Sequence, residues 1–403
     1  MNAPSCVQEL PFLDLNAPGF SWQHPAVAAA RGKHWAARSA TGVLVLRYAE
    51  TAELLHDTRL VQNLRFLVER AGATRGLLHD QATASLQSRD GTDHHRTRGR
   101  LVTRSFTAAE VTRMRPFIQA TARALTEQLA AGPRDFVTAF AEPLPLTVIC
   151  HLLGIPHGDH DLVLDPAKDA GLLLALDHDP GLLPRVEAGN AALTRYAQTL
   201  VRHRTTDTNG DSLLARLQRA RQNGTLDESD LPGLLVDLLV AGFNTVSHQL
   251  SLAMVAFANH PDQWNLLRKR PELAEQAVDE VLRHCPTTAT IWRHTTQDLH
   301  YQGLHIPAKT PVNLSVHSAH RDPHIFPDGD VFDITTTHRT PLLAFGGGTH
   351  YCPGATLSHT QLTEALTTLT AHLGPPRITG PVTWRPPVGV GGPETLPLAF
   401  GPP

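Results

Sequence analysis

The chain has 403 residues, of which 41% are hydrophobic and 18% charged, and its formal net charge is -3. This composition is typical of a globular protein whose core is large enough to need no disulfide bonds. The near-neutral charge provides no basic surface field and argues against a nucleic-acid-binding protein. The cysteines are Cys6, Cys150, Cys285 and Cys352. They form no zinc-binding pattern, so we expect reduced thiols and a cytoplasmic protein.

No targeting or membrane segment is expected. The first residues, MNAPSCVQELPFLDL, lack the basic start and the apolar run of a signal peptide. The most apolar stretch, LPGLLVDLLVAGF at 231–243, is shorter than the roughly 18 residues of a membrane helix and contains Asp237. We predict a buried core helix there. Histidine-rich runs at 157–160 and 177–179 are predicted to be solvated loops rather than metal sites.

Helical periodicity dominates the chain. In chain order, apolar residues recur at helical spacing at 108–130, 180–204, 227–261, 271–284 and 354–374. Ser229, Asp230 and Pro232 suit the start of the longest helix, and Pro261 suits its end. Short strand-like stretches lie at 42–48, 299–307 and 310–317, and frequent proline and glycine after 307 predict irregular coil. We therefore predict a mainly α fold with small β-sheets (α+β), in a single domain over 1–403.

The sequence AFGGGTHYCPGATL, at 344–357, places a cysteine in a glycine-rich turn directly before a predicted helix. Glycines permit positive φ angles and the close approach of a flat ligand. The helix N-terminus in front of Cys352 should lower the pKa of the thiol. A thiolate in this position is either a nucleophile or a metal ligand, and a haem iron needs only one protein ligand.

This turn resembles the haem-binding loop of the cytochrome P450 family, Phe-Gly-x-Gly-x-His/Arg-x-Cys-x-Gly. The matching residues are Phe345, Gly346, Gly348, His350, Cys352 and Gly354. The resemblance implies a haem b with Cys352 as its axial thiolate, Phe345 near the sulfur and His350 on a haem propionate. It also implies the family's triangular prism, with the haem between the long central helix and the helix after the cysteine.

A second motif is Glu280-Val281-Leu282-Arg283. Glu280 and Arg283 lie three residues apart on a predicted helix, so they share a face and can form an ion pair. Alone, such a pair is a common surface feature. In the family, a Glu-x-x-Arg at this distance before the cysteine forms a buried pair, which implies a structural role for both residues.

A third motif, AGFNTV at 241–246, lies midway along the longest helix and resembles the oxygen-activating stretch of the family. The resemblance makes four residues candidates for the catalytic stretch: Ala241, Gly242, Asn244 and Thr245. Gly242 would let a ligand approach the helix, and Thr245 would hydrogen-bond the bound oxygen or a proton-relaying water. The alternative is that Thr245 only bonds back to the carbonyl of Ala241. Asn244 replaces the acid usual in the family, and an amide cannot move protons by ionising.

The haem propionates need cationic partners. The stretch DGTDHHRTRGRLVTRSF at 90–106 is similar to a family motif, and the resemblance places His94 and Arg98, four apart on one helix face, on the propionates. Arg293, in TIWRHTTQD, matches another propionate residue. With His350 these groups would form charge-assisted hydrogen bonds to the haem. The stretch SAHRDPHIFPDGDVFD at 318–333 resembles the coil before the cysteine loop.

Substrate and partner predictions also follow from the resemblance. Carried over from the family, the candidate substrate contacts are Gln62, Asn63, Phe66, Val240, Asn244, Thr287, Ile291 and Trp292. This mixture of aromatic, amide and hydroxyl groups suits a medium-sized polar natural product, such as an aromatic compound or a cyclodipeptide. We expect electrons from a ferredoxin and its NAD(P)H-dependent reductase. Arg96, Arg100 and Arg104 are candidates for the basic patch that attracts the ferredoxin.

The leading hypothesis is therefore a soluble bacterial monooxygenase that hydroxylates a secondary metabolite. Oxidative C–C or C–N coupling of aromatic units, such as cyclodipeptide dimerisation, is the alternative that Asn244 keeps open. A non-catalytic haem protein that binds a ligand, and a hydrolase that uses Cys352 with His350, belong to other classes.

Overall fold

The computed structural model describes residues 6–17, 19–85, 87–88, 99, 101–203 and 212–402. The α-helices are α1 (Pro25–Lys33), α2 (Tyr48–Leu54), α3 (Leu64–Arg70), α4 (Leu77–Ala84), α6 (Ala108–Leu129), α7 (Pro143–Leu153), α8 (His160–Ala170), α9 (Leu183–His203), α10 (Leu213–Gln222), α11 (Asp230–Asn259), α12 (Pro261–Lys269), α13 (Ala274–His284), α14 (Val316–Ala319) and α15 (Ala355–His372). Short 3₁₀ turns include η2 (Arg104–Phe106), η5 (Gly171–Ala175), η6 (Pro180–Leu182), η7 (Pro271–Leu273) and η8 (Gly348–His350).

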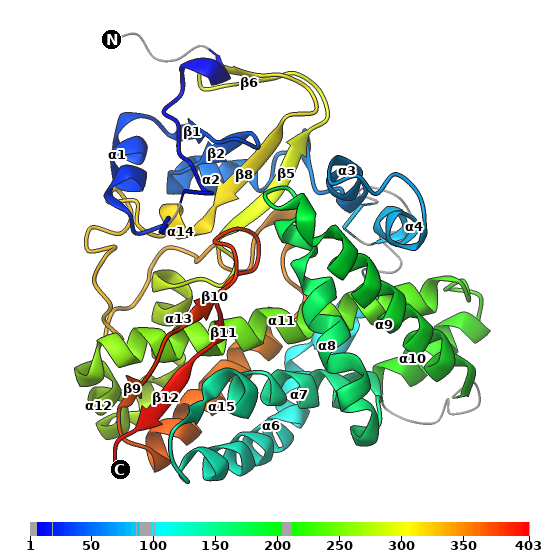
Figure 1. The fold of residues 1–403 in the computed structure, drawn as a ribbon, viewed down its shortest axis with the longest axis vertical. Helices are drawn as coiled ribbons and strands as arrows, with labels where there is room; N and C mark the ends of the chain where they lie inside the picture. Colours follow the sequence, from blue (N-terminus) through cyan, green and yellow to red (C-terminus); the bar gives the residue numbers. More distant parts are fainter. Residues whose placement is uncertain are drawn as a thin grey trace.

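The strands are short. They are β1 (Ala36–Arg38), β2 (Val43–Val45), β3 (Leu60–Val61), β4 (Arg134–Asp135), β5 (Thr290–Thr295), β6 (Leu299–Tyr301), β7 (Leu304–Ile306), β8 (Pro311–Ser315), β9 (Pro376–Ile378), β10 (Thr383–Trp384), β11 (Pro393–Thr395) and β12 (Pro397–Phe400). Helices form the lower part of the molecule in Figure 1, and the largest sheet lies above them. The α+β fold class predicted from the sequence is confirmed.

The largest sheet has the strand order β1-β2-β8-β5-β3. Strands β2 and β8 pair in parallel, with Val43 opposite Val312, and the other pairs are antiparallel. Strand β8 is buried along its whole length because neighbouring strands and helices cover it. This burial fixes the register of β5, on which Trp292 pairs with Asn313. The sheet thereby positions three predicted site residues, at 291–293.

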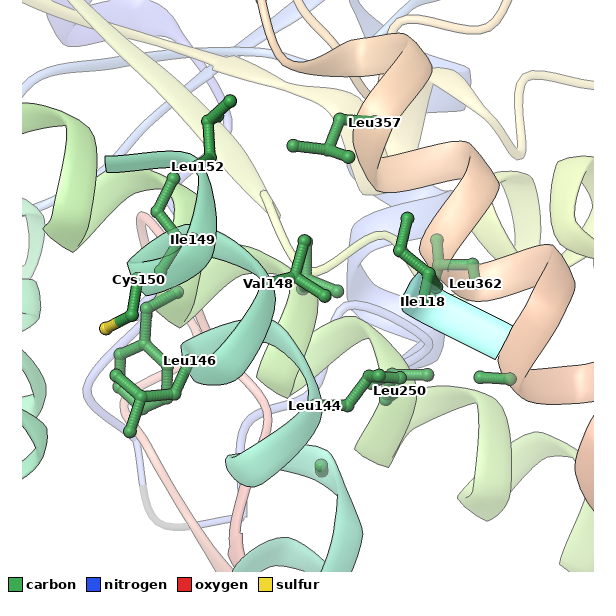
Figure 2. Close-up of a cluster of buried hydrophobic side chains, with 14 of the residues drawn as sticks. Ile118, Leu144, Leu146, Val148, Ile149, Cys150, Leu152, Leu250, Leu357 and Leu362 are labelled. Atoms are coloured by element: carbon green, nitrogen blue, oxygen red, sulfur yellow. The ribbon is translucent and has the colours of Figure 1, made fainter. Parts of the chain in front are cut away.

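Helix α11 runs through the centre of the helical part (Figure 1), where it contacts α7, α9, α13 and α15. Among the described helices it is the one whose length and composition would allow it to cross a membrane, and 61% of its most apolar window is buried in the protein. Figure 2 shows side chains of α7, including Val148, pointing toward Ile118 of α6, Leu250 of α11 and Leu362 of α15. The predicted core helix is therefore confirmed.

Several predicted boundaries change where tertiary contacts or turns intervene. The helix predicted over 180–204 begins as the turn η6 and continues as α9. The predicted strand over 299–307 is a hairpin of β6 and β7, which turns at Gln302 and Gly303, both with positive φ. The strand predicted over 42–48 ends at Val45, because Tyr48 starts α2 with its N–H bonded to the carboxylate of Asp322 at 3.0 Å.

A buried ion pair on α13 fastens the irregular coil that precedes the cysteine turn. The guanidinium of Arg283 donates to both carboxylate oxygens of Glu280 at 2.8 Å, and the two side chains are at most 3% exposed. Arg283 also donates to the carbonyls of His320, Gly329 and Val331. These carbonyls belong to the coil after α14, so one side chain fixes three of its turns.

Glu280 completes this network from the acidic side. Its carboxylate accepts the N–H of Asp333 and a hydrogen bond from His338, both at 2.9 Å. Burial alone would raise the pKa of Glu280, but the hydrogen bonds from Arg283 and His338 lower it from 4.5 to about 2. The structural role predicted for the pair agrees with these contacts, because loss of either partner would leave a buried charge uncompensated.

The lowered pKa of Glu280 predicts a pH dependence of stability. Its contribution is complete above pH 4.5 and is lost as the pH falls toward about 2, which corresponds to about 3 kcal/mol of unfolding free energy. Denaturant titrations between pH 7 and pH 3 should therefore show a smaller acid-induced loss in Glu280→Gln than in the wild type. The exposed Glu187, changed to Gln, should retain the wild-type slope. An unchanged slope in Glu280→Gln would contradict the assignment.

Candidate active site

The cysteine turn is built by backbone hydrogen bonds that close it before α15. The N–H of Cys352 donates to the carbonyl of Phe345 at 3.0 Å, and the N–H of Gly346 donates to that of Leu343 at 2.9 Å. The N–H of Ala355 then donates to the carbonyl of Cys352 at 3.3 Å, where α15 begins. The chain thus folds back between Phe345 and Cys352, as expected for a site that presents one sulfur from a rigid loop.

Glycine is required in this turn for two reasons. Gly346 and Gly348 have φ angles of +74° and +64°, which residues with a Cβ rarely adopt. A Cβ on Gly348 would also lie 2.6 Å from the carbonyl oxygen of Leu55, at the end of α2. The predicted positive φ angles are confirmed. The group that approaches Gly348 closely is the backbone at Leu55, whereas a flat ligand was expected.

The pKa of the Cys352 thiol is raised, whereas the sequence predicted that it would be lowered. Burial raises its pKa, and the hydrogen bond from the N–H of Gly354 lowers it by a smaller amount. The expected effect of the helix N-terminus is present, but desolvation of the anion outweighs it. In the metal-free chain the thiol is therefore a poor nucleophile. This argues against the hydrolase alternative, since a neutral thiol attacks carbonyl groups slowly.

Cys352 lines a cavity, called here the Cys352 cavity, whose walls come from several distant parts of the chain. The cysteine turn contributes Phe345, Gly346, His350 and Cys352, and α11 contributes Thr245, Val246 and Gln249. Strand β5 and the residues before it contribute Thr287, Thr288, Thr290, Ile291, Trp292 and Arg293, and Gln62 and Leu174 also line it. The turn and α11 were predicted to meet at one site, and the structure brings them together.

Thr245 lies on the cavity face of α11. Its hydroxyl donates to the carbonyl of Ala241, one turn earlier, at 2.9 Å. This back-bond is the alternative that sequence reasoning left open for Thr245, and it leaves the oxygen lone pairs available to a water or ligand in the cavity. Gln249, four residues later on the same face, also lines the cavity. Sequence reasoning missed Gln249, although its spacing from Thr245 signalled it.

Asn244 is turned away from the Cys352 cavity. It is 3% exposed, and its amide donates to the carbonyls of Ala167 on α8 at 2.9 Å and of Val240 at 3.1 Å. Arg385 contacts its amide oxygen at 3.5 Å. A Cβ on Gly171 would lie 2.5 Å from this amide. Asn244 therefore does not line the Cys352 cavity, and its amide fastens α11 to α8, so its predicted contact with a substrate stays a prediction.

Gly242 also has a role different from the predicted one. A Cβ at this position would lie 2.7 Å from Cδ1 of Ile149 on α7. The absence of a side chain therefore permits two helices to pack closely, rather than a ligand to approach α11. Gly242 and Asn244 thus lie on faces of α11 that α7 and α8 cover, which explains why neither lines the Cys352 cavity.

The residues around the cavity fit a haem by the chemistry of their donor groups. One thiol, the imidazole of His350 and the guanidinium of Arg293 line the same cavity, which suits an iron and the carboxylates of a porphyrin. Arg293 is 2% exposed and donates to Gln62 at 2.6 Å. The indole N–H of Trp292 is buried without a partner among the described residues. The predicted propionate residues His94 and Arg98 lie outside the described residues.

The remaining substrate predictions divide into two groups. Gln62, Thr287, Ile291 and Trp292 line the Cys352 cavity. Asn63, Phe66 and Val240 do not. Asn63 caps α3 by accepting the N–H of Phe66, whose ring lies 6.0 Å from that of Trp292, and Val240 packs against the core. These three residues support the walls from behind.

Comparison with known proteins identifies relatives along the whole chain. Residues 190–373 match the family described as Cytochrome P450. Luteothin monooxygenase of Streptomyces thioluteus is 45% identical over 394 residues, with 98% of this chain and 97% of the relative covered. Nocardicin C N-oxygenase of Nocardia uniformis subsp. tsuyamanensis is 32% identical, with 89% of each chain covered.

Solved structures show the same similarity. The crystal structure of CalO2 has a TM-score of 0.86 at 29% identity, with 96% of this chain and 97% of that chain covered. A structure described as the cytochrome P450 enzyme CxnD for C–S bond formation in chuangxinmycin biosynthesis also has a TM-score of 0.86, at 30% identity, with both chains fully covered. The similarity therefore extends over sequence and fold.

The packing role of Gly242 can be tested by adding one methyl group. Gly242→Ala should lower the free energy of unfolding by about 1–3 kcal/mol, because the new Cβ overlaps Ile149. In an Ile149→Ala background the same substitution should cost clearly less, and a double-mutant cycle by denaturant titration measures this coupling. Equal costs in the two backgrounds would show that Gly242 does not pack against Ile149.

Proposed function

Because this chain belongs to the cytochrome P450 family and is a P450 monooxygenase, we propose that it hydroxylates a medium-sized secondary metabolite with O₂ at a haem b held by Cys352. The observation that carries the proposal is the Cys352 cavity, in which the cysteine turn and the Thr245 face of α11 meet. Bound haem would supply the oxidising chemistry, and its thiolate ligand favours O–O bond cleavage. Arg293 and His350, with His94 and Arg98, would bind the haem carboxylates.

In this proposal the chain contributes proton delivery and substrate orientation. Thr245 donates its own proton to the Ala241 carbonyl, so its oxygen can accept a hydrogen bond from a water and hold that water in the cavity as the proton donor. Asn244 has no part in the relay, because both amide N–H groups are used by backbone carbonyls. The absence of an acid at 244 therefore supplies no structural argument for radical coupling, and hydroxylation is favoured over C–C or C–N bond formation.

The cavity lining supports a substrate with both an aromatic part and hydrogen-bonding groups. Trp292, Ile291 and Leu174 provide apolar surface, and the hydroxyls of Thr288 and Thr290 and the amide of Gln249 add polar groups. Luteothin is the first compound to test, because the most similar of the relatives described above is named for it. Cyclodipeptides and other aromatic natural products remain within the proposed class.

The proposal includes a cytoplasmic location and electrons from a ferredoxin reduced by an NAD(P)H-dependent reductase. Arg104 of the predicted docking patch is exposed on η2, which supports a ferredoxin contact there. Arg96 and Arg100 lie outside the described residues.

Turnover with surrogate ferredoxin, reductase and NADPH tests the function. Products of luteothin and of a cyclodipeptide panel are analysed by mass spectrometry. A product heavier by one oxygen atom supports the proposal. A product with the mass of two substrates less two hydrogens would replace hydroxylation by oxidative coupling, and consumption of NADPH without any product from the panel would contradict the substrate class.

The axial ligand has a spectroscopic test. Cys352→Ser should abolish the red-shifted absorption band of the reduced carbon-monoxide complex, because this band requires a thiolate on the iron. Cys285→Ser is the matched control, since burial raises the pKa of Cys285 to about 12 and the residue lies away from the turn. A band that persists in Cys352→Ser would overturn the assignment.

The different orientations of Thr245 and Asn244 predict different effects on coupling. Thr245→Ala should lower the product formed per NADPH about tenfold, because the hydroxyl on the cavity face is lost. Asn244→Ala should leave this ratio unchanged, although the lost hydrogen bonds should reduce stability by about 1–3 kcal/mol. Product and peroxide yields per NADPH measure the ratio. A loss of coupling in Asn244→Ala would return this residue to the proton path.

A further inference from the structure

A second large cavity lies apart from the Cys352 cavity. This outer cleft has a volume of about 1080 Å³. Its lining comes from the N-terminal segment at 15–23, the end of α11, the segment 284–289, residues 317 and 321 near α14, and the β10 region at 384–387. Asp330, Gly391 and Gly392 also line it, so segments from distant parts of the sequence enclose the cleft. None of the residues assigned to the haem lines this cleft, and the proposed function makes no use of it.

Arg321 is the polar centre of the outer cleft. Its side chain is 3% exposed, and the guanidinium donates to the carbonyl of His284 at 2.7 Å and contacts Nδ1 of His317 at 3.1 Å. Its Nε contacts Asp330 at 3.1 Å. A guanidinium has five N–H groups. Three of them make the bonds above, so two N–H groups of Arg321 can donate to another acceptor.

The contact with Arg321 determines the protonation of His317. Arginine can only donate, so Nδ1 of His317 must accept. Burial lowers the pKa of His317 well below 6.5, and the ring is neutral. The proton of the neutral ring is then on Nε2, which makes this atom an N–H donor of a residue that lines the cleft.

His284 contributes a second neutral imidazole to the lining. Burial lowers its pKa to about 3, with a further contribution from Arg321. The residue is 8% exposed, and its Nδ1 is buried without a partner in the part of the chain that the structure describes. Buried polar groups of this kind are rarely left unsatisfied in folded proteins.

The charges around the outer cleft favour an anion. Arg321 and Arg385 line it, and both side chains are at most 4% exposed. The guanidinium of Arg385 is bound to the carbonyl of Lys168 and the amide oxygen of Asn244, so Arg321 supplies the cation of the lining. The carboxylate partners of the two arginines, Asp330 and Glu394, are 86% and 45% exposed. Asp330 itself lines the cleft beside Arg321, but water screens its exposed carboxylate more than the buried guanidinium, which leaves Arg321 able to attract an anion.

Aromatic rings form the other part of the lining. The ring of Trp22 stacks on that of His317 at 6.4 Å, and Phe20 meets Trp22 edge to face at 5.4 Å. Trp384, on β10, is 51% exposed although it lines the cleft. An exposed indole beside Pro386 and Pro387 is surface that a flat apolar molecule would cover.

We propose that the outer cleft is a second ligand site, which binds a planar aromatic carboxylate independently of the Cys352 cavity. The carboxylate accepts hydrogen bonds from Nε2 of His317 and from the remaining donors of Arg321. The aromatic ring packs against Trp22 and Trp384. The ligand is an anion with one aromatic ring system, which matches the buried cation and the aromatic wall of the cleft.

The outer cleft shares one wall segment with the Cys352 cavity. Thr287 lines both, and its N–H donates to Gln249 of α11 at 2.9 Å, while its hydroxyl donates to the carbonyl of Gly391 at 2.8 Å. The two sites are thus neighbours with separate linings. A binding test must therefore report which of the two a compound enters.

Calorimetric titration of the haem-loaded protein with indole-3-acetate tests the proposal, with indole-3-acetamide as the neutral probe. The acid should bind saturably at one site per chain without a shift of the visible haem band. The amide should bind about tenfold more weakly, because the carboxylate interaction is lost. Asn259→Trp, which fills the cleft from the end of α11, should weaken binding of the acid about tenfold or more.

Two substitutions of exposed apolar residues provide a matched comparison. Trp384→Ala should weaken binding of the acid, whereas Leu162→Ala, on α8 and outside the cleft, should not. Absence of saturable binding would overturn the proposal, as would equal affinities of acid and amide or full affinity in Asn259→Trp. A haem-band shift that follows the titration would place the acid in the Cys352 cavity and would also overturn it. If the protein binds no haem, the proposed function fails, but the titration still measures binding at the outer cleft. The two proposals can therefore fail separately.

Discussion

The position of Cys352 depends on the buried ion pair between Glu280 and Arg283. The coil between α14 and the cysteine turn has no regular secondary structure over most of its length, so helix or sheet hydrogen bonds do not fix its path. Arg283 supplies donors to three carbonyls of that coil, and Glu280 accepts from the N–H of Asp333. The coil ends where the N–H of Leu343 donates to His320 at 2.8 Å, two residues before Phe345. The ion pair thus fixes the coil that leads into the cysteine turn and, through it, the position of the Cys352 sulfur.

Different faces of helix α11 line the Cys352 cavity and pack against neighbouring helices. Thr245 and Gln249 face the Cys352 cavity, whereas Asn244 and Gly242 face α8 and α7. Adjacent residues on a helix are rotated by about 100°, so neighbours in the AGFNTV motif cannot all face one cavity. The amide of Asn244 is suited to its position, because it can donate to two backbone carbonyls where a carboxylate would meet them with repulsion. The replacement of the usual acid is accordingly a packing feature in this structure.

Burial changes the acidity of two cysteine thiols and the effect of two buried arginines. Cys352 lies at the start of α15, yet burial dominates its pKa, and Cys285 is similarly kept protonated. Arg321 and Arg385 remain cations inside the protein, and Arg321 gives the outer cleft an attraction for anions that composition and net charge do not reveal. A chain with a net charge of -3 can therefore present a local site for an anion.

The sequence by itself determined the features that depend on short, fixed spacings. The cysteine turn, the shared helix face of Glu280 and Arg283 and the periodic helices belong to this class, because neighbouring residues alone set their geometry. Strand β5 was not predicted from the sequence pattern, and the resemblance to the family alone placed its residues at 291–293 beside the cavity. Only the tertiary structure decided which face of α11 each motif residue occupies, how acidic Cys352 is, and that distant segments enclose the outer cleft. These properties arise from contacts between elements far apart in the chain, and a local pattern does not encode which helix covers a given face or how much water it excludes.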